Sequence, residues 1–159
     1  MLEWLEGTDL SSWIRTELWG WPLALTLHAL GTAVVVGFVL IIGLRLFRLF
    51  ELIPLSGLVR LFPIVWAGLA LQLLTGFVLW MTRPTRYVSD SAFVLKVALI
   101  VLGTALVVNV FCLIRREAAS AQSGEAASSR AAAMAAVTLF VWCAVVIASR
   151  LTGYLGAIG

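Results

Sequence analysis

Hydrophobic residues are gathered in four long stretches that are separated by shorter polar segments. The stretches cover approximately residues 21–44, 61–81, 91–114 and 131–155. Each is about as long as the roughly 20 helical residues needed to cross ~30 Å of hydrocarbon. Their apolar residues do not alternate with polar ones, which favours helices over barrel strands. The pattern therefore predicts an all-α protein, an integral membrane four-helix bundle, with residues 1–159 forming a single transmembrane domain.

A shorter pattern precedes the first stretch. Apolar residues recur there at helical spacing, and Asp9 stands in front of them as an N-cap: Leu10, Trp13, Ile14, Leu18 and Trp21. We predict a short N-terminal amphipathic helix that lies in the membrane interface, and a lid packed on the bundle explains the pattern equally well. The chain starts with acidic residues where a signal peptide would need a basic start, so we expect the first stretch to remain in the protein.

Proline and small residues suggest where the helices end. Pro22 and Pro63 are expected in the first turns of the first and second spanning helices, where a missing amide proton costs nothing. Arg83, Pro84 and Thr85 are expected to end the second. Residues 115–130 are rich in Ala and Ser, which fits either helical extensions of both neighbours or a flexible loop.

Composition excludes several classes of protein. Hydrophobic residues make up 62% of the chain and charged residues 12%, far from the usual balance of a soluble protein. The net charge of +3 is spread over the whole length, so no basic patch predicts a nucleic-acid partner. Cys112 and Cys143 lack the spacing of a metal site and lie at different depths, so we predict two packing residues without a disulfide.

Arginines in the loops predict the orientation. The two loops on one side carry six: Arg45, Arg48, Arg60, Arg115, Arg116 and Arg130. The other side carries four: Arg15, Arg83, Arg86 and Arg150. Because the side richer in basic residues stays in the cytoplasm, we predict a protein of the bacterial inner membrane with both termini in the periplasm. Seven Trp fit the aromatic belts of a membrane protein.

Four polar side chains lie at membrane depth and are the candidate site residues. His28, Lys96 and Arg150 lie in the outer half of their spans, roughly 7 to 10 Å below the boundary at 1.5 Å per residue. Gln72 lies nearer the middle, on a face with small residues. Ionisable groups are costly inside a membrane. We predict that His28, Gln72 and Arg150 turn toward the bundle interior and cluster with Lys96.

A purely structural explanation covers the same positions. A histidine can be hydrogen-bonded to a neighbouring helix, while a lysine and an arginine reach the outer headgroups. Glu17 and Asp90, at the outer ends of their spans, are the carboxylates that could neutralise Lys96 and Arg150. Asn109, near the inner end of the third span, is predicted to bond between helices.

Loose motifs in the four spans resemble those of a known group of proteins. The marks are His28, then Thr75 with Gly76, then Phe93 with Lys96, and finally Arg150 with Tyr154. With these, the chain resembles a family of small four-helix bacterial inner-membrane proteins of unknown function, distantly similar in layout to copper-resistance D proteins. The resemblance implies the architecture and these residues, and no activity. One His and three Met are too few soft ligands for a copper path.

Three functions fit the pattern. The first is a non-enzymatic accessory or ligand-binding subunit of a membrane complex, with the bilayer and other membrane subunits or a second copy as partners. The second is a redox protein that holds a b-type haem or a quinone at His28, Lys96, Arg150 and Gln72, with His28 as the metal ligand of the haem iron. The third is a small transporter element lined by His28, Gln72 and Lys96. No catalytic triad, carboxylate pair or phosphate loop is visible in the sequence.

Overall fold

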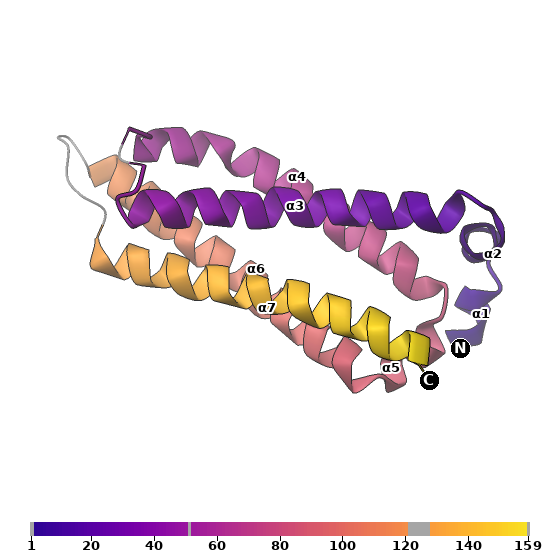
Figure 1. The fold of residues 1–159 in the computed structure, drawn as a ribbon. Helices are drawn as coiled ribbons and strands as arrows, with labels where there is room; N and C mark the ends of the chain where they lie inside the picture. Colours follow the sequence, from indigo (N-terminus) through magenta and orange to yellow (C-terminus); the bar gives the residue numbers. More distant parts are fainter. Residues whose placement is uncertain (1, 51, 121–127, 159) are drawn as a thin grey trace.

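The chain is a bundle of helices in the computed structural model, which describes the backbone of residues 2–50, 52–120 and 128–158 (Figure 1). Side chains are described for 4–50, 52–119 and 128–150. The helices are α1 (Leu2–Glu6), α2 (Asp9–Thr16), α3 (Gly20–Leu46), α4 (Leu55–Met81), α5 (Pro84–Ser89), α6 (Ser91–Ser120) and α7 (Ser129–Ile158). The described ranges contain no strand, and the predicted all-α four-helix bundle is confirmed.

Four of these helices are long and apolar enough to cross a membrane, so the chain is a multi-pass membrane protein. They are α3, α4, α6 and α7. Around the bundle α3 packs on α4 and α7, and α6 packs on the same two helices. The short helices α1, α2 and α5 lie together at one end, which we call the cap end, where α7 also finishes (Figure 1). The opposite end, with the α3–α4 loop, is called the far end.

One expectation about proline is wrong and one is confirmed. α4 begins at Leu55, directly after Pro54, so Pro63 lies inside the helix and not in its first turn. A spanning helix tolerates such a proline because neighbouring groups satisfy the freed carbonyl. α4 ends at Met81, just before Arg83, Pro84 and Thr85, as predicted, and Pro84 is also the first residue of α5. The missing amide proton of proline suits that first position.

The predicted amphipathic helix is α2, and it packs on the end of the bundle. Thr8 is its N-cap, with Oγ1 accepting from Ser11 N at 3.3 Å, so the prediction of Asp9 in that role is wrong by one residue. Ile14 is buried, and Ser11 Oγ donates to Met81 O of α4 at 3.4 Å. The opposite face leaves large apolar side chains exposed, so α2 has one face toward the bundle and one suited to the membrane interface.

Residues 115–130 are mostly continuations of the two neighbouring helices. α6 runs on to Ser120 and α7 begins at Ser129. Residues 121–127 lie outside the described part. The alternative of helical extensions therefore holds for both flanks of this segment.

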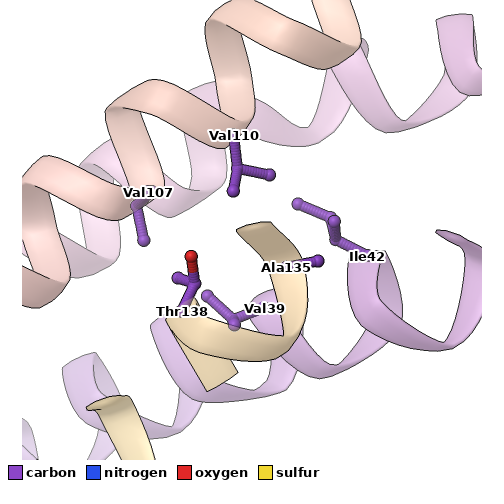
Figure 2. A pocket seen from close by; sticks show the side chains of 6 residues that line it. All are labelled: Val39, Ile42, Val107, Val110, Ala135 and Thr138. Atoms are coloured by element: carbon purple, nitrogen blue, oxygen red, sulfur yellow. The ribbon is translucent and has the colours of Figure 1, made fainter. Parts of the chain in front are cut away.

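The hydrophobic core fills the far half of the bundle. Phe38, Phe62 and Phe111 form its aromatic centre, with ring centroids 5.0 Å and 4.2 Å apart along the row. Between α3, α6 and α7 a small space remains, with room for little more than one water molecule. Its lining is apolar except for one hydroxyl (Figure 2): Val39, Ile42, Val107, Val110, Ala135 and Thr138. The far half is thus a packed apolar core.

Candidate functional site

Two glycines bring α3 and α4 into close contact beside the candidate site. A Cβ added at Gly31 would lie 2.9 Å from the backbone nitrogen of Gln72 and 3.0 Å from Gly68 O. A Cβ at Gly68 would lie 2.7 Å from Cγ1 of Val34. Small residues at helix crossings allow such approach in membranes. The crossing puts the polar side chains of one helix within hydrogen-bond reach of the other.

His28 is held against α4 by Thr75. Nδ1 of His28 lies 3.0 Å from Oγ1 of Thr75, and a Cβ at Gly76 would lie 3.2 Å from Cε1 of the ring. Thr75 Oγ1 itself donates to Leu71 O at 2.6 Å. A hydroxyl has one proton, so this oxygen can only accept from the ring. Nδ1 therefore carries the proton of the neutral imidazole, and Nε2 carries the lone pair.

The second contact across the helix crossing joins Thr32 to Gln72. Thr32 Oγ1 donates to Gln72 Oε1 at 2.6 Å. Gln72 is only 3% exposed, so the prediction that it faces protein is confirmed. We call His28, Thr32, Gln72 and Thr75 the polar cluster. It joins α3 to α4 with hydrogen bonds between side chains.

Lys96 of α6 belongs to the same region. Its side chain is half-buried, and α6 packs against α4, the helix that carries Gln72 and Thr75. Counted along their helices from the cap end, Lys96, Thr75 and His28 lie about 8, 9 and 12 Å deep at 1.5 Å per residue. The predicted agreement in depth is therefore present for His28 and Lys96.

Asp90 and Glu17, the two carboxylates that were expected to neutralise Lys96 and Arg150, have other positions and contacts. Asp90 Oδ1 accepts from Ala92 N at 2.9 Å and caps the first turn of α6. Glu17 is exposed at the C-cap of α2. Among the residues whose side chains are described, no carboxylate forms an ion pair with Lys96. Its cationic group stands beside the polar cluster without an acidic partner from that part of the chain.

Arg150 is exposed on α7, so the expectation that it turns toward the interior is wrong. The buried positions of α7 form one stripe: Ala131, Ala135, Thr138, Val141, Trp142 and Val145. Continued at the same spacing, that stripe reaches Ser149. Arg150 lies about 100° around the helix from it. The side chain of Tyr154, another mark of the resemblance, lies outside the described side chains.

The same reasoning corrects three further predictions. Asn109 is exposed and donates to Ala105 O of its own helix at 2.8 Å, so it makes no bond between helices. Cys112 and Cys143 are exposed and not buried packing residues, although both are free thiols, as predicted. The buried stripe of α6 passes through Val107 and Val110 and leaves Asn109 and Cys112 on the outer face.

Thr32 and Thr75 have roles that sequence reasoning missed. Thr32 donates to Gln72 Oε1 and Thr75 accepts from His28 Nδ1, and these two contacts join α3 to α4. Their spacing held a signal: Thr32 follows His28 by four residues, and Thr75 follows Gln72 by three, so each pair shares a helix face. Thr75 was singled out only as a mark of the resemblance.

No group of three or more His, Cys, Asp or Glu that could hold a metal ion occurs in the described residues. His28 as a metal ligand stays a prediction. Comparisons of the chain with protein-family models, with curated proteins and with solved structures found no match.

Proposed function

We propose that the chain is a non-enzymatic, ligand-binding subunit of a membrane complex, and that its ligand binds at the polar cluster and Lys96. The supporting observation is the hydrogen-bond chain from His28 Nδ1 through Thr75 Oγ1 to Leu71 O. This chain orients the imidazole with one nitrogen and leaves Nε2 as an acceptor.

The test is the identity of what co-purifies with the protein. The full chain is purified in mild detergent, extracted with organic solvent, and the extract is analysed by mass spectrometry. We expect a ligand that is present in stoichiometric amount in the wild type and lost in His28→Ala, with helical content unchanged.

Thr138→Val is the matched control. Thr138 is a buried threonine that donates to Met134 O four residues earlier, as Thr75 does to Leu71 O, but it lies in the far half. This variant should keep the ligand. An extract of the wild type without any stoichiometric small molecule would contradict the proposal.

A redox role is the second candidate, and the position of the His28 ring favours it. Histidines that bind a metal commonly donate their other ring N–H to an oxygen, as Nδ1 of His28 does to Thr75. A b-type haem would take Nε2 as axial ligand, with a second ligand from another chain or none. An absorption spectrum of the purified protein, oxidised and reduced, tests this: a Soret band that is lost in His28→Ala supports haem, and its absence argues against haem.

We propose the inner membrane of a bacterium as the location, with both termini in the periplasm. The arginine count in the α3–α4 and α6–α7 loops supports this orientation. Single cysteines placed at Trp4 and at Leu52, in a chain whose Cys112 and Cys143 are replaced by Ser, would test it with an impermeant thiol reagent. Labelling at Trp4 and protection at Leu52 in intact spheroplasts is expected, and the reverse pattern would refute the orientation.

Partners in the membrane follow from the outer faces of α6 and α7. Arg150 and Asn109 are exposed there, on helices whose other exposed residues are mostly apolar. Polar side chains on a lipid-facing surface commonly meet another helix or the headgroups. We propose a second copy or another subunit at this face, and cross-linking through Cys112 or Cys143 would identify it.

A further inference from the structure

We propose that the ligand of the polar cluster is a lipid-soluble hydroquinone, with one phenolic hydroxyl donating to His28 Nε2 and an oxygen of the same molecule accepting from the Lys96 ammonium. This inference rests on the proposed function and specifies its ligand class. Four observations carry it: the contact of His28 Nδ1 with Thr75, the lack of a carboxylate partner for Lys96 among the described side chains, the position of the ring at the edge of the buried face, and the distance of the site from the small space between α3, α6 and α7.

The tautomer requires a donor on the ligand. Thr75 gives its proton to Leu71 O, so it can only accept from Nδ1. This contact holds the proton on Nδ1, and Nε2 is left to accept. A hydroxyl bonds to such a nitrogen, whereas the carbonyl of an oxidised quinone would face it with a second lone pair.

Lys96 requires an acceptor on the ligand. Its ammonium has three protons and no acceptor capacity. No carboxylate among the described side chains pairs with it, although it is half-buried at membrane depth. A charge in such a position is stabilised by an electron-rich or anionic oxygen. The site therefore presents one acceptor and one donor, which match the hydroxyl and the electron-rich oxygens of a hydroquinone.

The position of the ring favours a ligand that arrives through the bilayer. On α3, Ala24 and Gly31 beside His28 are buried, whereas Leu25 and Ala29 beside it are exposed. The half-buried imidazole thus lies at the border between the buried and the lipid-facing sides. The small interior space lies in the far half, away from this site. An apolar ligand dissolved in the membrane can reach the ring sideways without an enclosed pocket.

The experiment compares reduced and oxidised probes. Decylubiquinol, decylubiquinone and the dimethyl ether of the quinol are titrated anaerobically into the full chain in lipid nanodiscs, with tryptophan fluorescence as the readout. We expect the quinol to bind at least about tenfold more tightly than either analogue, because a site built to bond a hydroxyl discriminates strongly against ligands that lack it.

Variants of Thr75 and Lys96 test whether the preference for the quinol depends on these two side chains. Thr75→Val should remove the preference for the quinol, and Thr75→Ser should restore it, because serine keeps the accepting oxygen. Lys96→Met should weaken binding of the quinol and of its oxidised form alike. Thr138→Val, the matched control from the far half, should bind as the wild type does, and circular dichroism verifies that every variant is folded.

The outcomes separate this inference from the proposed function. If His28→Ala loses a co-purifying ligand but the quinol, the quinone and the ether bind equally or not at all, the ligand class is wrong and the binding site stands. If no ligand co-purifies and no probe binds, both are wrong. A quinol preference that survives in Thr75→Val would overturn the assignment of the His28 tautomer and with it the inference.

Discussion

The two halves of the bundle are stabilised in different ways. In the far half the buried residues are almost all apolar, and Phe62 lies between Phe38 and Phe111 at its centre. In the cap half α3 and α4 are joined by hydrogen bonds of the polar cluster, such as that from Thr32 to Gln72. Along the first part of α6, from Ser91 to Leu102, no residue is buried.

This difference separates stability from binding. The far half is stabilised by dispersion contacts between apolar side chains. These contacts have no preferred direction, and a substitution weakens them when it removes side-chain atoms. Hydrogen bonds in the cap half fix the direction of particular atoms, and this direction is what a ligand would recognise. The comparison predicts that substitutions in the far half change stability without changing the ligand, and that most substitutions in the polar cluster do the reverse.

The largest effect is expected for Phe62→Ala. Removing a buried aromatic side chain costs about 3 to 5 kcal/mol in soluble cores, and the contacts with Phe38 and Phe111 give this site comparable packing. Unfolding in mixed detergent and SDS micelles would measure the loss, and any ligand should still bind to the folded fraction. Phe77→Ala, on an exposed position of α4, is the control and should change stability little.

Gly31→Ala should be an exception to this comparison, because it should lower both stability and ligand binding. Its methyl group would lie 2.9 Å from the nitrogen of Gln72 and 3.0 Å from Gly68 O, both backbone atoms that cannot turn away. The helices must move apart, at a cost of about 1 to 3 kcal/mol, and the polar cluster must open with them. Both the unfolding midpoint and ligand binding should fall.

Gly37→Ala is the matched control for this prediction. It lies on the same helix, and an added Cβ there would meet nothing within 4 Å. Alanine should be neutral or stabilising by up to about 1 kcal/mol, because glycine is the poorer helix former. Equal losses in the two variants would refute the role assigned to the helix crossing.

The four spans could be predicted because the length and hydrophobicity of a segment can be read without knowing what packs against it. The rotation of each helix about its own axis could not be predicted. Nearly every position in α6 and α7 is apolar, so the sequence gives little periodicity to show which face is buried, and Arg150, Asn109, Cys112 and Cys143 were all assigned to the wrong face. Gln72 was assigned correctly because small residues mark its side of α4.

The site itself could be predicted in part. A lone histidine and a lone lysine, both in the outer half of their spans, drew attention to His28 and Lys96. The hydroxyl proton that decides the His28 tautomer depends on a contact between two helices, which no spacing within one helix reveals. Two helix starts were placed too late: α2 is capped by Thr8 and not by Asp9, and α4 begins at Leu55, before the apolar stretch that was expected from residue 61.

Thr32→Val sharpens the comparison by removing one hydroxyl, which donates to Gln72 Oε1 across the helix crossing and also lies 3.0 Å from His28 O in its own helix. Side-chain hydrogen bonds between membrane helices contribute about 0.6 kcal/mol on average and at most about 1.7, so a small loss of stability within that range is expected. Loss of this bond should also loosen Gln72. Thr26→Val, an exposed threonine that bonds only to Pro22 O in its own helix, should show no loss. A loss above the stated range would mean that Thr32 does more than bond to Gln72.

The smallest effect is expected for the largest buried side chain, in Trp142→Phe. Trp142 is 0% exposed, and within the part of the chain that the structure describes its Nε1 finds no hydrogen-bond partner. The ring lies so close to Gly103 that a Cβ there would be 3.1 Å from Nε1. Phenylalanine removes the unpaired N–H, whose burial costs about 1 to 3 kcal/mol. It also leaves a gap that costs a similar amount. The two terms oppose each other.

The net change for Trp142→Phe should therefore stay within about 1 kcal/mol, although the same residue type is expensive to replace in most cores. Unfolding in SDS measures it, and Trp66→Phe, at an exposed position of α4, gives the baseline for loss of an indole to lipid contacts. Gly103→Ala tests the other side of the contact, because its methyl group would press on the indole and not on the smaller ring. It should destabilise the wild type more than it destabilises Trp142→Phe. A loss of about 2 kcal/mol or more in Trp142→Phe alone would contradict the expected balance between the released N–H and the gap.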